Sequence, residues 1–188
     1  MTDPALSIAV PLIAGFEGFR SEPYQDQGGV WTYGFGFTVE PDGRHVTAAT
    51  APITQEAALA RLSDMVARVI VLVRGMVPAT ATDHQVAALA SLAFNIGTNA
   101  LRNSTLLRFL NAGNVGEAAH AFMAWVYVAG TPSDGLKRRR AAERVVFLTA
   151  DQSCKNAANY SDPIPETPTA PESVADCLDD EFNAPEHP

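Results

Sequence analysis

The order of apolar and polar positions along the first 150 residues predicts a mostly helical chain with a short strand region near its start. Apolar residues recur at helical spacing in six segments that Gly, Pro or polar residues separate: 5–17, 54–74, 83–96, 103–112, 115–128 and 135–149. Thr54 is the expected N-cap of the long second helix, which runs through Arg74 and has Pro78 beyond its end. Pro11 is expected either to open or to kink the first helix.

Two or three short strands are expected between residues 19 and 48. Apolar and small or polar residues alternate from Val30 to Thr38 with the period of a half-buried strand. The inward face would carry the aromatic residues Trp31, Tyr33, Phe35 and Phe37. The open face would carry Thr32 beside Gly34 and Gly36, and two glycines on one face indicate the close approach of a bulky ligand or, alternatively, strand curvature.

Candidate chemistry lies around this strand. Glu17 ends the first apolar helix, Asp26 lies in the turn Asp-Gln-Gly-Gly, and Thr32 follows on the returning strand. The negative end of a helix and partial burial both favour a protonated Glu17, as a general acid requires. Asp26 in a polar turn should stay ionised. Each residue also has an ordinary explanation: a solvated helix end, a turn former and a strand residue.

The segment Phe16–Thr38, with Glu17, Asp26 and Thr32, resembles the catalytic signature of the phage-type lysozymes, the endolysins or muramidases of glycoside hydrolase family 24. Four later segments resemble the helical lobe of the same family: Asp83–Gly97, Asn103–Asn111, Ala121–Trp125 and Gly135–Arg144. Many relatives have His where this chain has Phe37, a position that is not catalytic in the resemblance. The resemblance thus extends over most of the first 150 residues.

The resemblance implies an α+β, lysozyme-like fold, with a small N-terminal β lobe and a larger helical lobe joined by a long helix and separated by a cleft. The expected reaction is hydrolysis of the β-1,4 bond between N-acetylmuramic acid and N-acetylglucosamine in peptidoglycan. Glu17 would protonate the leaving oxygen, Asp26 would stabilise the cationic transition state, and Thr32 would hold the attacking water. Gly34, Gly36 and Asn95 would contact the glycan. A carboxyl separation of about 6.5–9.5 Å would predict inversion and one of about 5–5.5 Å retention.

Three other functions remain open on the sequence alone. A lytic transglycosylase would cut the same bond with one acid and no water, and a chitinase or chitosanase would differ only in substrate. A non-catalytic wall-binding or virion structural protein would bind peptidoglycan without turnover.

The last 38 residues differ from the rest in composition. Residues 1–150 contain twelve basic and twelve acidic side chains, whereas residues 151–188 contain one lysine, nine acids and six prolines, so the net charge of −8 resides entirely in this second part. We expect a catalytic domain over 1–150 and an irregular or disordered acidic tail over 151–188. The tail either is a solubilising end or masks Lys137–Arg140.

Lys137–Arg140 is the one short basic run. It lies at a helix start in a part of the chain without net charge, which argues against nucleic-acid binding. We expect one face of the run to pair with carboxylates of the first helix or of the cleft.

The remaining features predict no cofactor and no metal. Cys154 and Cys177 have no accompanying nucleophile motif, although an oxidising compartment would allow them to pair, and the four histidines lack ligand spacing. Neither a secretory signal nor a membrane-spanning segment is predicted. The resemblance implies a monomer that accumulates in the host bacterial cytoplasm and reaches the periplasm and cell wall after a separate holin-type protein permeabilises the membrane.

Overall fold

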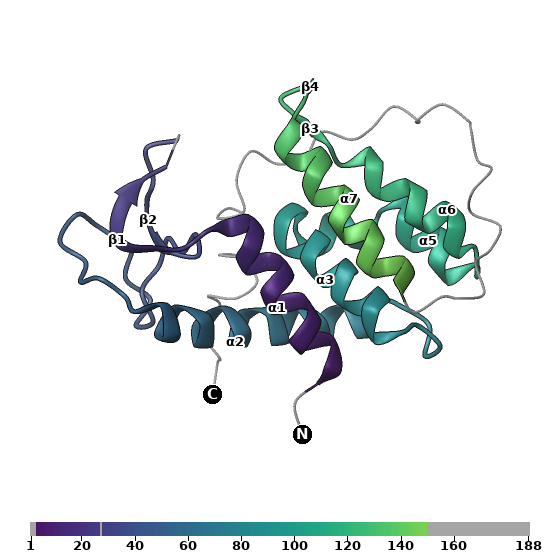
Figure 1. The fold of residues 1–188 in the computed structure, drawn as a ribbon, viewed down its shortest axis with the longest axis horizontal. Helices are drawn as coiled ribbons and strands as arrows, with labels where there is room; N and C mark the ends of the chain where they lie inside the picture. The colour runs from purple at the N-terminus through teal and green to yellow at the C-terminus, as the bar shows by residue number, and fades with distance from the viewer. Residues whose placement is uncertain (1–2, 27, 150–188) are drawn as a thin grey trace.

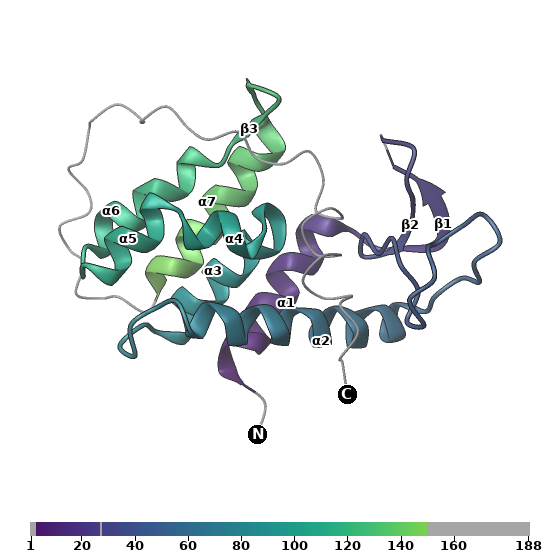
Figure 2. The same ribbon diagram turned by 180° about the vertical axis from the view of Figure 1, so that it is seen from behind.

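The computed structural model describes residues 3–26 and 28–149. A small β lobe and a larger helical lobe lie at opposite ends of one long helix, α2 (Gln55–Arg74), as Figure 1 shows. Figure 2 shows the same arrangement from behind, with α4, α5 and α6 in front. This confirms the expected α+β arrangement of a small β lobe and a larger helical lobe joined by a long helix.

Helix α1 (Pro4–Glu17) ends at the candidate acid. Asp3 caps it by accepting a hydrogen bond from the Ala5 amide at 2.9 Å, and Pro4 occupies the first turn, where no backbone donor is needed. Pro11 lies inside the helix, which continues through it. Gly18 stops the helix with φ 70°, a left-handed conformation that glycine adopts at little cost. Glu17 is therefore fixed at the last helical position.

Helix α3 (Asp83–Ile96) forms the centre of the helical lobe. Eleven of its fourteen residues are buried, because α1, α2 and α7 (Asp134–Thr149) all pack against it. The expected ranges 83–96 and 135–149 are confirmed to within a residue, and Thr54 caps α2 as predicted. A helix covered on all sides brings distant segments into one core.

The β lobe contains β1 (Arg20–Gln25) and β2 (Trp31–Gly34), which pair antiparallel. The prediction of one strand from Val30 to Thr38 is wrong. The chain reverses after Gly34, and Tyr33 and Phe37 exchange backbone hydrogen bonds of 3.0 and 2.9 Å across the turn. Gly34 and Gly36 have φ values of 63° and 88°, so both glycines serve this turn.

Two other predicted helices are wrong in their bounds. The range 103–112 is α5 (Thr105–Asn111), and a short helix α4 (Thr98–Arg102) precedes it; Ser104 caps α5 through the Leu107 amide. The range 115–128 is only α6 (Val115–Ala121), followed by a 3-10 turn η1 (Phe122–Ala124) and the hairpin β3 (Tyr127–Val128) and β4 (Thr131–Pro132). The residues after Ala124 are aromatic and β-branched, which favours extended backbone over helix.

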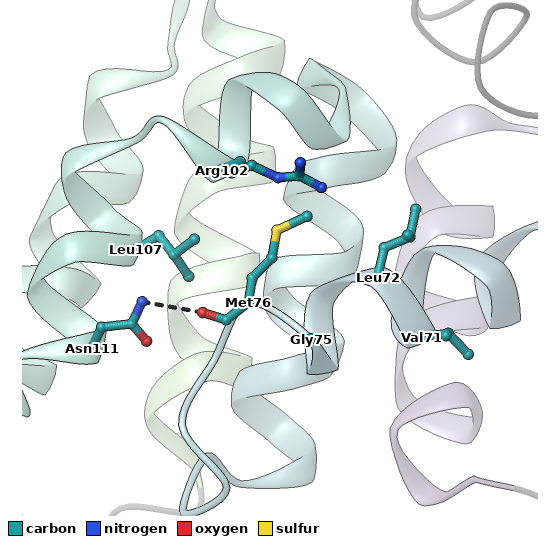
Figure 3. A pocket seen from close by; sticks show the side chains of 7 residues that line it. All are labelled: Val71, Leu72, Gly75, Met76, Arg102, Leu107 and Asn111. Atoms are coloured by element: carbon teal, nitrogen blue, oxygen red, sulfur yellow. Dashed lines mark hydrogen bonds between the residues drawn. The ribbon is translucent and has the colours of Figure 1, made fainter.

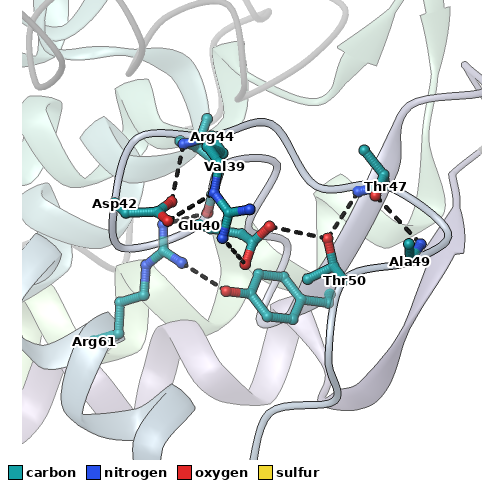
Figure 4. Close-up of polar contacts among 9 residues, drawn as sticks. Val39, Glu40, Asp42, Arg44, Thr47, Ala49, Thr50 and Arg61 are labelled. Atoms are coloured by element: carbon teal, nitrogen blue, oxygen red, sulfur yellow. Dashed lines mark hydrogen bonds and ion pairs between the residues drawn. The ribbon is translucent and has the colours of Figure 1, made fainter.

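Arg61 of α2 ties the β lobe to the long helix. Its guanidinium donates to the Tyr33 hydroxyl at 3.1 Å and to the Val39 carbonyl (Figure 4). The guanidinium carbon also lies 4.4 Å from the centre of the Phe37 ring. Phe37 therefore packs between Gly34 and a cation.

Candidate functional site

Glu17 lies at the junction of the two lobes. Its Oε1 forms an ion pair with Nη1 of Arg139 at 2.8 Å, and its side chain is 17% exposed. A β-carbon on Gly36 would lie 3.7 Å from Oε2, so the second oxygen is adjacent to the exposed backbone of the β-lobe turn. One carboxyl oxygen is thus anchored from α7 and the other borders the β lobe.

Asp26 occupies the turn between β1 and β2. Its Oδ1 accepts hydrogen bonds from the amides of Gly28 and Val30, each at 2.9 Å, and its backbone amide donates to the Val30 carbonyl. Asp26 therefore does form the turn, as its sequence position suggested. The two amides hold Oδ1 of the carboxylate, so Oδ2 is the oxygen that can face a substrate.

Thr32 is not on an open face as expected. It is 4% exposed, and its hydroxyl donates to the Val30 carbonyl at 3.1 Å. The alternation rule fails here because the successive residues Thr32 to Gly34 are all buried, so β2 has no open face at this point.

The two glycines differ in their surroundings. Gly34 is buried, and a β-carbon there would come within 2.6 Å of the Phe37 ring. The space above Gly34 is therefore filled by this chain's own side chain. Gly36 is exposed and adjoins Glu17, and its contact with the glycan stays a prediction.

Asn95 comes from α3 and joins the same region through Arg140. Its Oδ1 accepts a hydrogen bond from Nη2 of Arg140 at 2.9 Å. A guanidinium can only donate, which identifies the amide oxygen as the inward atom and makes the amide nitrogen the donor for any ligand.

The expected pairing of the basic run with a first-helix carboxylate is confirmed by the contact between Arg139 and Glu17. The run divides on the helix: Arg139 and Arg140 are buried, whereas Lys137 is 47% exposed and pairs with Asp134 at 2.9 Å. Arg139 therefore places a positive charge directly beside the Glu17 carboxyl group.

Glu143 is the residue that the sequence reasoning left without a role. It is fully buried, and its Oε1 lies 3.2 Å from Nε of Arg139 and 3.1 Å from Nη2 of Arg140. Ser91 of α3 donates its hydroxyl to the same oxygen at 2.7 Å. The signal was available: Glu143 follows the two arginines by four and three positions, the spacing of one helix face.

Burial shifts the ionisation of this cluster. It lowers the pKa of Arg140 to about 10, although the Glu143 carboxylate acts in the opposite direction, so Arg140 remains charged near neutral pH. Burial raises the pKa of Glu143, while Arg140, Arg139 and the Ser91 hydroxyl favour its ionised form. The two arginines and the Ser91 hydroxyl thus oppose the effect of burial on Glu143.

The described surface also has a cavity in the helical lobe, distinct from Glu17. Its volume is about 480 Å³, and Figure 3 shows its lining from α2, α4 and α5, with Asn111 donating to the Met76 carbonyl at 3.1 Å.

Among residues 3–26 and 28–149, no three His, Cys, Asp or Glu side chains group as they would around a metal ion. No helix in these ranges is long and apolar enough to cross a lipid bilayer.

A two-lobed α+β fold with a helix-terminal glutamate between the lobes defines the lysozyme class of glycosidases. A family model described as phage lysozyme matches residues 14–143. The chain is 39% identical to an endolysin of Acyrthosiphon pisum secondary endosymbiont phage 1, over 74% of this chain and 94% of the relative.

Two solved structures share the fold. An endolysin from Escherichia coli O157:H7 phage FAHEc1 superposes with a TM-score of 0.71 at 32% identity, covering 80% of this chain and 95% of the other. The muramidase domain of SpmX from Asticaccaulis excentricus gives a TM-score of 0.64 at 35% identity, covering 74% and 94%. The protein belongs to the phage lysozyme family. It is a glycosidase of the endolysin type.

Proposed function

We propose that this endolysin cleaves the β-1,4 bond between N-acetylmuramic acid and N-acetylglucosamine, with Glu17 as the general acid. The observation that supports this best is the asymmetric environment of the Glu17 carboxyl group. Oε1 is held by Arg139 at 2.8 Å, while Oε2 borders the exposed turn at Gly36.

In this mechanism the proton resides on Oε2 and is transferred to the glycosidic oxygen as the bond breaks. Oε1 accepts from Arg139 before and after the transfer, and the guanidinium stabilises the carboxylate that the transfer leaves behind. Asp26 presents Oδ2 to the oxocarbenium-like transition state while its turn holds Oδ1. Thr32 donates its own hydrogen to Val30, so it can hold the attacking water only by accepting a hydrogen bond.

Glu17→Gln tests the assignment of the acid. The amide keeps the shape of the side chain but has no transferable proton, so turnover of purified Gram-negative peptidoglycan should fall by at least about a hundredfold. The matched control is Glu22→Gln, the same change at an exposed position of β1, which should leave activity unchanged. The released ends are analysed in parallel: reducing muramic acid ends identify hydrolysis, and anhydro-muramic ends identify a transglycosylase. Near-normal activity of folded Glu17→Gln would overturn the role of Glu17.

We infer that residues 1–150 are sufficient for catalysis, since all the proposed site residues lie within the described ranges. Residues 150–188, including Cys154 and Cys177, lie outside the described residues. Arg139 and Arg140 are buried with carboxylate partners in the fold. This leaves Arg138 and the exposed Lys137, itself paired with Asp134, for an acidic tail to mask. Deleting residues 151–188 should leave low-salt activity and wall affinity unchanged within about twofold. A larger increase in either would support masking.

We also propose that the protein is a monomer and that a separate holin-type protein gives it access to the wall. Expression in a bacterial host without such a protein should then leave the cells intact until the membrane is permeabilised chemically. Lysis without permeabilisation would contradict this.

A further inference from the structure

Glu143 is unusual among the described carboxylates because it is fully buried and is shared by two arginines of its own helix. Its Oε2 forms an ion pair with Nε of Arg140 at 2.8 Å, in addition to the contacts of Oε1 with both guanidiniums. The 0% exposure of Glu143 and Arg140 excludes direct contact with a glycan. Any effect of Glu143 and Arg140 on the reaction must therefore be transmitted by other residues.

Each arginine has a second partner nearer the glycan site. Arg139 extends from Glu143 to Oε1 of Glu17, and its Nη2 also donates to the Ser91 carbonyl at 3.4 Å. Arg140 extends from Glu143 to the amide oxygen of Asn95. One buried carboxylate thus determines the placement of two guanidiniums, each of which holds one residue of the proposed site.

We propose that Glu143 is a positioning residue for the glycosidase reaction: through Arg139 it orients the acid Glu17, and through Arg140 it orients the amide of Asn95. This inference rests on the proposed role of Glu17. With Glu143 ionised, its charge offsets that of one of the two arginines. The cluster then carries one positive charge while Glu17 is protonated, and none once Glu17 has given up its proton.

The charge balance gives a measurable consequence. The charged groups that face Glu17 in the described contacts are Arg139 and, farther away, Arg140, both on α7, while α3 contributes the uncharged Ser91 and Asn95. In Glu143→Gln the cluster gains a net positive charge, which stabilises ionised Glu17. A general acid that loses its proton at lower pH moves the basic limb of the kcat/KM profile to lower pH.

The experiment measures kcat and KM against pH on soluble glycan strands prepared from peptidoglycan, for wild type and Glu143→Gln. We expect the basic limb to move down by about half to one pH unit and KM to rise severalfold as Asn95 loses its orientation. Glu143→Asp keeps the charge but withdraws it by one methylene, so a shift in the same direction but smaller is expected. Asp keeps a negative charge beside the two guanidiniums and should therefore fold more readily than Gln. If Glu143→Gln does not fold, the pH profile of Glu143→Asp tests the proposal.

Two controls separate positioning from stability and from net charge. Phe147→Leu removes packing from the same helix, where Phe147 meets Phe122 at 5.3 Å between ring centres, and should lower Tm with no shift of the limb. Glu117→Gln makes the same charge change at an exposed position and should shift nothing. The proposal is overturned if a folded Glu143 variant has the same KM as wild type and the basic limb of its kcat/KM profile lies at the same pH. If Glu17→Gln remains active, it is the assignment of the acid that fails instead.

Discussion

Two arginine–carboxylate clusters in this protein have similar chemistry and opposite surroundings. In the β lobe, Arg44 contacts Asp42 at 2.7 Å and Glu40 at 3.6 Å, with 72% of the Arg44 side chain exposed (Figure 4). In the helical lobe, Arg140 and Glu143 make equally short contacts with no exposure at all. Water solvates the charged groups of the first cluster even when they are apart. The buried charges of the second cluster have no water around them and depend on one another for stabilisation. Burial rather than distance therefore decides how much an ion pair contributes to stability.

The largest effect is expected from breaking the buried cluster. Glu143→Ala removes the carboxylate and leaves Arg140 buried and uncompensated, which should reduce the free energy of unfolding by about 3–5 kcal/mol. Denaturant unfolding at pH 7, followed by circular dichroism, measures it. A loss below about 1 kcal/mol would show that water or rearrangement replaces the lost partner.

Gly34→Ala tests whether burial has the same importance inside the β lobe. The new β-carbon would lie 2.6 Å from the Phe37 ring, on a backbone with φ 63°. We expect a loss of about 2–4 kcal/mol from overpacking and left-handed strain together. Gly43→Ala is the matched control, because Gly43 has φ 84° but nothing within 4 Å of the new carbon. If Gly34→Ala and Gly43→Ala lose the same free energy of unfolding, backbone strain alone accounts for the loss and the Phe37 ring moves aside.

The exposure of the ion pair between Asp3 and Arg74 lies between those of the Arg44 and Glu143 clusters. Asp3 pairs with Arg74 at 2.7 Å, with about a third of each side chain exposed, and the Arg74 hydrogen bond lowers the pKa of Asp3 below its ordinary value of 3.8. A lowered carboxylate pKa contributes stability above the unfolded-state value, and that contribution is lost as pH falls through the folded-state value. Asp3→Asn keeps the helix cap but not the charge, so its Tm should lie a few degrees below wild type at pH 7. The difference should close as pH falls below the ordinary value of 3.8 and through the lower folded-state pKa of Asp3. A constant difference across pH would assign the effect to capping.

The smallest effect is expected from the exposed cluster. Arg44→Ala and Asp42→Ala should leave Tm at the wild-type value within the error of a thermal melt, and added salt should change neither. A clear loss in either variant would show that the β-lobe loop depends on this pair, and would weaken the contrast with Glu143.

The sequence by itself determined the elements whose signals are local. Helix α2 begins after Thr54, α3 and α7 occupy their expected ranges, and Glu17 ends the first helix, because periodicity and caps depend on neighbours within a few residues. The family signature around Glu17, Asp26 and Thr32 also lies in one short segment. These features could be predicted without any tertiary contact.

The tertiary structure alone decided which residues meet. Arg139 and Glu17 are 122 positions apart, and only the packing of α1 and α7 on α3 selects Arg139 rather than Arg138 for the contact. The same packing buries Glu143, and the fold of the β lobe buries Thr32, which alternation placed in the open. Local patterns fix the face of a helix or strand, but the free energy of burial is set by the partner that covers that face, and the partner comes from elsewhere in the chain.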